Sequence, residues 1–153
     1  MSPTSASGNM NKAVVRPAGV EDRVALQRLY SSAIAAAMWL PESRRVADDF
    51  DEVTQDELVL VCVNAGADIL GFISVFVPDR FIHHLYVSPG LEGVGIGSIL
   101  LATLPAYVSL PWSLKCVLAN TRARQFYAKH GWFEAGRGDG ADGPYVVLTM
   151  HDR

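Results

Sequence analysis

Three glycines at alternate positions, Gly93, Gly95 and Gly97, constrain this chain more than any other feature of its sequence. They follow an apolar, strand-like run, Phe81–Val87, and lead into a segment with an apolar helical face made by Ile96, Ile99, Leu100, Thr103 and Leu104. Such glycines let the backbone approach a ligand closely and point N–H groups outward at the start of a helix. The segment predicts either a phosphate-binding loop or simply a tight strand-to-helix turn.

Two common phosphate-binding loops do not match this segment. In the dinucleotide pattern Gly-x-Gly-x-x-Gly, the third glycine would fall on Ser98 or Leu100. The nucleotide-triphosphate loop needs Gly-Lys-Ser/Thr, which does not follow here. The rest of the chain must therefore indicate the ligand.

Strands and helices alternate irregularly around this loop. Before it we expect a strand at Ala13–Arg16, a helix that buries Leu26, Leu29, Tyr30, Ala33, Ile34 and Ala37, a short helix within Glu42–Phe50, and a hairpin of Leu58–Val63 with Ile69–Val77. After it we expect a strand at Leu114–Ala119, a helix from Asn120 or Thr121 to Gly131, and two strands, Trp132–Ala135 and Tyr145–Met150, that flank a glycine-rich turn. The order predicts a mixed α/β sheet.

Composition limits the domain count and the class of partner. The chain has 153 residues, of which 50% are hydrophobic, so we expect one domain, at 13–153. The opening residues are rich in Ser, Asn and small side chains without periodicity, so we expect a disordered tail at 1–12. It carries 13 basic and 16 acidic residues without a basic run, which argues against nucleic acid. It has no long apolar run or secretory signal pattern, so we expect no membrane partner and a cytoplasmic protein.

The two cysteines, Cys62 and Cys116, lie in apolar, strand-like runs. They are too few to indicate a disulfide framework or a metal site, and we expect both to be buried and reduced. A nucleophilic cysteine that forms an acyl-enzyme is the less favoured alternative. The sequence predicts no metal ligand.

Two motifs carry a family resemblance. His83–Pro89 followed by Gly93–Leu101 resembles motif A of the GNAT N-acetyltransferases, and Asn120–Trp132 resembles a later motif of that family, in which an Asn-started helix carries Phe-Tyr and ends at Gly-aromatic. The resemblance implies a GNAT-like, mostly antiparallel sheet of about six to seven strands with about four helices. It also implies acetyl-CoA as cosubstrate, a small-molecule or peptide amine as acceptor, and a possible homodimer.

The resemblance further implies which residues bind acetyl-CoA. They are Leu85, Tyr86 and Val87 on the strand, Glu92, Gly93, Val94, Gly95, Ile96, Gly97 and Ser98 in the loop, and Asn120, Arg122, Phe126 and Tyr127 in the later motif. Glu92 departs from the family pattern, which usually has Arg or Gln there. A carboxylate should repel a pyrophosphate, whereas the backbone N–H groups of the loop do not depend on that side chain.

Three side chains are candidates for catalysis by this resemblance. Tyr127 matches the family tyrosine that protonates the departing sulfur, with packing on the helix as the alternative. His83 and His84 are candidates for the base that deprotonates the amine. Alternation along a strand should send them to opposite faces, with His83 beside Phe81, Leu85 and Val87, so that only one faces the substrate. We favour His83, with a packed or surface histidine as the alternative.

Other roles remain open at this stage. Asn120 could serve only as a helix cap, Arg122 and Arg124 could be solvated or could meet CoA phosphates, and His130 should interact with the end of its helix. Trp39, Arg44, Arg45, Asp48, Asp49 and Tyr145 are plausible linings of an acceptor pocket. The rival functions are an acyl-CoA-binding sensor without transfer activity, which Glu92 favours, and a partner-binding domain without a cofactor.

Overall fold

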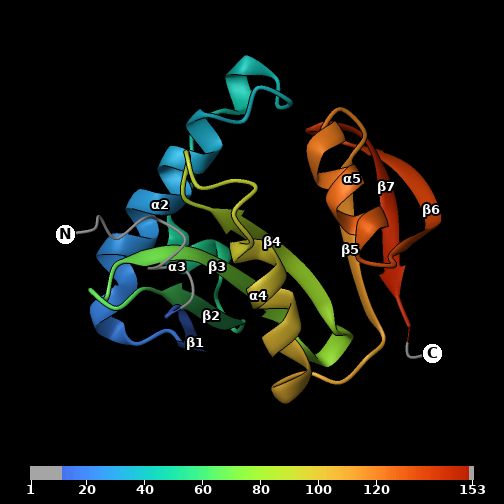
Figure 1. Ribbon diagram of the computed structural model, residues 1–153. Coiled ribbons are helices and arrows are strands. Elements are labelled where there is room, and N and C mark those ends of the chain that lie inside the picture. The colour runs from blue at the N-terminus through green and yellow to red at the C-terminus, as the bar shows by residue number, and fades with distance from the viewer. Residues whose placement is uncertain (1–11, 152–153) are drawn as a thin grey trace.

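The computed structural model describes residues 12–151, which form a seven-stranded sheet (Figure 1). The strands are β1 (Val14–Pro17), β2 (Leu58–Val63), β3 (Ile69–Phe76), β4 (Phe81–Val87), β5 (Trp112–Val117), β6 (Phe133–Gly140) and β7 (Gly143–Met150), in the spatial order β1-β2-β3-β4-β5-β7-β6. Only β4 and β5 pair in parallel. The expected mixed, mostly antiparallel sheet is confirmed, while the tail predicted at 1–12 falls, except for Lys12, outside the described residues.

Helices cover both faces of the sheet. Within the described residues the α-helices are α2 (Arg23–Ala35), α3 (Phe50–Val53), α4 (Ile96–Thr103) and α5 (Thr121–Lys129), with 3-10 turns η1 (Val20–Asp22), η2 (Glu42–Arg44), η3 (Val77–Asp79) and η4 (Leu104–Ala106). Helix α2 packs on β3 and β4, and α4 crosses the other face of β1 to β4 (Figure 1). Among residues 12–151, no helix combines the length and the apolar character that a membrane span requires.

The side chains of β2 alternate between the two faces of the sheet, and both faces are buried at this strand. Leu60 and Cys62 belong to the core under α4, whereas Val61 and Val63 belong to the core under α2, and all four are at most 5% exposed. The strand is therefore apolar throughout. Cys62 and Cys116 are buried free thiols, as expected.

The short helix expected within Glu42–Phe50 is the 3-10 turn η2, which ends at Arg44, and α3 begins only at Phe50. Residues 45–49 between them form no helix. The Arg45 guanidinium instead donates hydrogen bonds to the carbonyls of Ala37, Leu40 and Met38, which holds this segment as a loop.

The glycines near the C-terminus lie in a strand instead of a turn. β6 continues through Gly136 and Gly138 to Gly140, and it pairs with β7 along this length. The ring of Tyr145 covers Gly138, where a Cβ atom would lie 2.5 Å from the tyrosine hydroxyl oxygen. Glycine is therefore required for this aromatic packing, which the sequence pattern alone did not reveal.

Gly71 on β3 determines how closely α4 approaches the sheet. A Cβ atom at this position would lie 2.9 Å from Cγ2 of Ile96 and 2.9 Å from the carbonyl oxygen of Tyr86. Ile96 is the first residue of α4, directly after the glycine loop. The missing side chain at Gly71 therefore fixes the position of the loop over β4.

β4 and β5 separate soon after they meet. Within the described residues their register contains one pair, Phe81↔Ser113, and the two strands diverge beyond it (Figure 1). The backbone of the second half of β4 consequently has no strand partner on the β5 side. Its polar groups on that side are available to a ligand.

Replacing Gly71 by Ala should destabilise the protein, because the added methyl group meets a backbone oxygen that cannot give way easily. We expect a loss of about 1–3 kcal/mol in the free energy of unfolding, measured by urea denaturation. Gly66→Ala is the control, since a Cβ atom there would make only ordinary contacts, the nearest at 3.5 Å. Equal stability of the two variants would contradict this account of how α4 is positioned.

Candidate functional site

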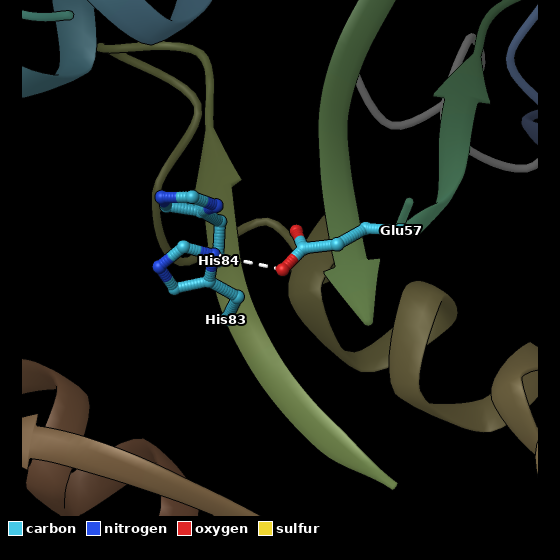
Figure 2. Close-up of side chains that lie close together, drawn as sticks. All are labelled: Glu57, His83 and His84. Carbon is cyan, nitrogen blue, oxygen red and sulfur yellow. Dashed lines mark hydrogen bonds and ion pairs between the residues drawn. The ribbon is translucent and has the colours of Figure 1, made fainter. Parts of the chain in front are cut away.

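A β-bulge in β4 creates the central feature of the site. Ser74 pairs with His84 and Val75 pairs with Ile82, so His83 is an extra residue without a partner on β3. A bulge of this kind interrupts the alternation of side chains and bends the strand. The two imidazole rings consequently lie on the same side, with their centroids 4.0 Å apart (Figure 2).

This arrangement corrects two predictions made from strand alternation. His83 and His84 do not point to opposite faces, and His83 does not share a side with Leu85 and Val87, which pack against the core under α4. His84 instead lies 5.4 Å from Tyr30 of α2, measured between ring centroids. Both histidines therefore line the same cavity, and the expectation that only one could do so was wrong.

Each histidine has a different hydrogen-bond partner. Nδ1 of His83 lies 2.9 Å from Oε2 of Glu57, the residue before β2, and Figure 2 shows the Glu57 carboxylate directed at this ring. Nδ1 of His84 lies 2.8 Å from Oγ of Ser74, which is fully buried. The His83 side chain is 44% exposed, whereas that of Glu57 is 8% exposed. The buried Glu57 carboxylate thus holds the solvent-accessible imidazole of His83 by a hydrogen bond to Nδ1.

The surroundings of His84 disfavour its charged form. Burial and the neighbouring His83 lower the pKa of His84 to about 3. His84 is therefore neutral near pH 7 and a weak proton acceptor. Of the two candidates for a base, His83 has the carboxylate partner and the solvent-accessible ring.

A cavity of about 670 Å³ opens where β4 and β5 part. Residues of the two predicted motifs meet in it: His83, His84, Leu85, Tyr86, Asn120 and Tyr127. Its lining also includes side chains from the α2–α3 segment and the β6–β7 hairpin, among them Trp39, Arg44, Asp48, Asp142 and Tyr145. The cavity therefore joins the predicted cofactor strand to the predicted acceptor region.

Tyr127 combines burial with access to this cavity. The residue is 7% exposed, and its ring packs edge-on against Trp132 at a centroid distance of 5.4 Å. Burial, with smaller contributions from Cys116 and Tyr86, raises the pKa of Tyr127. The phenol stays protonated and can donate a proton to a strong base that forms beside it. The packing role and the chemical role are thus compatible.

Cys116 also lines the cavity, beside the position of Tyr127. Burial raises its pKa to about 11, partly offset by Arg124. The thiol is therefore protonated at neutral pH and is a poor nucleophile. This environment disfavours the acyl-enzyme alternative.

The glycine loop adopts backbone angles that only glycine adopts readily. Gly93 has φ +85° and Gly95 has φ +100°, and Gly95 is the residue immediately before α4. A Cβ atom at Gly95 would meet nothing within 4 Å, which leaves the loop open to a ligand. Nη2 of Arg122 lies 3.9 Å from the Cβ position of Gly93, so its positive charge is next to the loop.

Glu92 turns back onto its own loop. Its Oε1 accepts a hydrogen bond of 2.8 Å from the backbone N–H of Gly90. The Glu92 carboxylate therefore occupies one backbone N–H donor of the loop, that of Gly90. The loop's remaining backbone donors do not depend on this side chain.

The other predicted loop residues differ in accessibility. Val94 is 43% exposed, whereas Ile96 is 1% exposed and offers a ligand only its backbone. Ser98 Oγ lies 2.8 Å from Nε2 of His130, whose Nδ1 contacts the carbonyl of Phe126 at 2.8 Å, so His130 interacts with the end of its helix as expected. A Cβ atom at Gly97 would lie 3.1 Å from Phe126, which brings α4 and α5 together.

Several predicted residues have structural roles in addition to or instead of a site role. The Asn120 side chain accepts a hydrogen bond from the Ala123 N–H and caps α5, although it also lines the cavity. Asp49 caps α3, and Arg45 binds backbone carbonyls, so neither lines the cavity. Val87, residues 92–98, Arg122 and Phe126 likewise lie outside the cavity lining.

Four residues that contact the histidines or line the cavity were not predicted as site residues: Glu57, Ser74, Tyr30 and Asp142. Asp142 forms an ion pair of 2.8 Å with Arg44, which also lines the cavity, and 98 residues separate the two in sequence. Glu57 and Ser74 come close to the histidines only through pairing of β2, β3 and β4. No local pattern around these four residues indicates such contacts.

The fold resembles several solved structures of low sequence identity. The apo form of YjaB from Escherichia coli is 18% identical, with a TM-score of 0.71 over 90% of this chain and 96% of that one. The ribosomal-protein-S18-alanine N-acetyltransferase of Escherichia coli is 16% identical, with a TM-score of 0.70 over 91% and 93% of the two chains. A putative acetyltransferase, yncA from Salmonella typhimurium, solved with its cofactor acetyl-CoA, is 19% identical, with a TM-score of 0.69 over 92% and 94%.

At the level of sequence, no curated protein matches this chain. The profile of the Acetyltransferase (GNAT) family, however, matches residues 25–132. That range includes the bulged strand, the glycine loop and the whole of α5. The chain therefore belongs to the GNAT acetyltransferase family.

Proposed function

We propose that this protein transfers an acetyl group from acetyl-CoA to an amine by direct attack. One observation carries the proposal: the exposed imidazole of His83 and the protonated phenol of Tyr127 line the same cavity, at the point where β4 and β5 part. Family membership supports acyl transfer in general. The structure of yncA with acetyl-CoA supports this cosubstrate.

The residues of the glycine loop fit a pyrophosphate. Gly93 and Gly95 have positive φ angles, and α4 begins directly after them, so backbone N–H groups and the positive end of the helix face the same space. Arg122 adds a cation beside the loop. Acetyl-CoA would supply a thioester, whose carbonyl carbon is open to attack by an amine.

His83 would accept the proton that the amine loses as its nitrogen bonds to the carbonyl carbon. Glu57 would orient the ring, because Oε2 lies 2.9 Å from Nδ1 and leaves Nε2 for the substrate. His84 lacks a carboxylate partner, and its low pKa makes it a weaker base. It would shape the cavity wall instead.

Tyr127 would protonate the sulfur as the carbon–sulfur bond breaks, which yields free CoA and the acetylated amine. Backbone N–H groups of β4 that face away from β3 would stabilise the oxyanion, since β5 does not pair with them beyond Phe81. The acceptor would enter from the outer part of the cavity, between the Arg44–Asp142 ion pair and Trp39.

A second candidate is an acyl-CoA-binding module without transfer activity. Glu92 favours it, because a carboxylate in the pyrophosphate loop weakens the attraction for phosphate. The retained Tyr127, which lines the cavity, favours the enzyme. Acetyl transfer to an amine distinguishes the two functions.

Tyr127→Phe should lower kcat by at least about 100-fold while leaving acetyl-CoA binding intact, because only the proton donor is removed. Thermal shift with acetyl-CoA, CoA, NAD and ATP measures binding, and thiol release with a panel of amines measures transfer. Tyr107→Phe, at a tyrosine 42% exposed and outside the cavity lining, is the matched control. Absence of a shift with either CoA form would overturn the cofactor assignment, whereas binding without transfer to any amine would favour the acyl-CoA-binding module.

Glu92→Gln should tighten acetyl-CoA binding by about two- to fivefold at low ionic strength, because it removes a negative charge and keeps an oxygen to accept from Gly90. The gain should shrink as salt is added. Glu52→Gln, an exposed acidic residue in α3, is the control for the change in net charge. Titration calorimetry at two salt concentrations measures the effect, and equal affinities of Glu92→Gln and the parent protein would exclude repulsion by Glu92.

A further inference from the structure

We propose that Glu57, His83 and His84 form a binding site for a divalent transition-metal ion, with Zn²⁺ as the best match. One ligand atom from each of the three residues lies within 4.8 Å of those of the other two. The residues come from two strand regions that are 26 positions apart and become neighbours across β3. This proposal departs from the expectation, based on the two cysteines, that the chain binds no metal.

The spacing of the ligand atoms suits a zinc ion. Zinc binds imidazole nitrogen and carboxylate oxygen at about 2.0–2.2 Å, so the ligands of a tetrahedral site lie roughly 3.3–3.6 Å apart. The distance between His83 Nδ1 and Glu57 Oε2 is 2.9 Å, and the cluster as a whole spans at most 4.8 Å. Small side-chain rotations would therefore bring all three atoms to coordination distance.

The Glu57 carboxylate provides a second and independent observation. Its side chain is 8% exposed, and its Oε1 is buried without a hydrogen-bond partner among residues 12–151. An unpartnered buried carboxylate oxygen is costly, because it loses its water without compensation. A cation bound beside it would remove this cost, and Figure 2 shows the carboxylate aimed at the two rings.

The chemistry of the remaining atoms agrees with a metal site. Ser74 Oγ contacts Nδ1 of His84 at 2.8 Å, and this hydrogen bond holds the imidazole ring in place beside His83. Two histidines and one glutamate are a ligand set that binds zinc in sites whose fourth coordination position stays open. The exposed edge of His83 provides the route from solvent.

A bound ion would affect the proposed reaction. Zinc on Nδ1 of His83 would leave the single proton of the neutral ring on Nε2, so that Nε2 has no lone pair with which to accept a proton from the amine. Zinc should therefore inhibit acetyl transfer, if His83 is the base. Binding itself does not depend on the proposed function.

Metal binding can be tested on tag-free protein that has been treated with a chelator. Titration calorimetry with Zn²⁺ should give one site, and Co²⁺ should give visible d–d absorption of a low-symmetry site. His83→Ala and Glu57→Gln should each weaken binding at least tenfold, since loss of even an outer partner of a metal ligand costs roughly 10- to 100-fold. His151→Ala is the control, because this exposed histidine lies outside the cluster.

The possible results separate the two proposals. Site-selective loss of Zn²⁺ affinity in the two cluster variants, with normal folding by circular dichroism, supports the metal site. Equal affinity in His83→Ala and the parent protein, or a parent protein that binds no zinc, overturns it. Zinc binding at the cluster without inhibition supports the metal site and contradicts the role of His83 as the base.

Discussion

The bulge at His83 is the constraint on which the site depends. The extra residue lies two positions after Phe81, the last residue of β4 that is in register with β5. A bulge bends its strand and increases the local twist, so it both turns His83 toward the cavity and carries β4 away from β5. The cavity, the unpaired backbone of β4 and the paired imidazoles all follow from one irregularity in the strand register.

The glycine loop is placed by packing at a distance from the loop itself. Gly71 lets Ile96 lie against β3, and Gly97 lets α4 and Phe126 of α5 come into contact. The N-terminus of α4 is therefore held from two sides, by the sheet and by the helix of the later motif. This explains how two motifs far apart in sequence contribute to a single site.

The two histidines illustrate how much environment adds to residue type. They are neighbours in sequence and their rings are nearly in contact, yet His83 faces a carboxylate and solvent while His84 faces a serine and aromatic rings. Burial and the neighbouring His83 disfavour a charge on His84, whereas the His83 ring is open to solvent. The two adjacent histidines thus differ in chemical properties because their hydrogen-bond partners and their burial differ.

Sequence alone determined the elements that depend on local rules. Hydrophobic periodicity gave α2, the β2–β3 hairpin and β4, and the spacing of Gly93, Gly95 and Gly97 gave the loop, because these patterns reflect the geometry of a single helix, strand or turn. The tertiary structure alone decided the direction of His83, the partnership with Glu57 and the ion pair of Arg44 with Asp142. These depend on the register between strands and on segments up to 98 residues apart, and no local pattern encodes a one-residue shift in register.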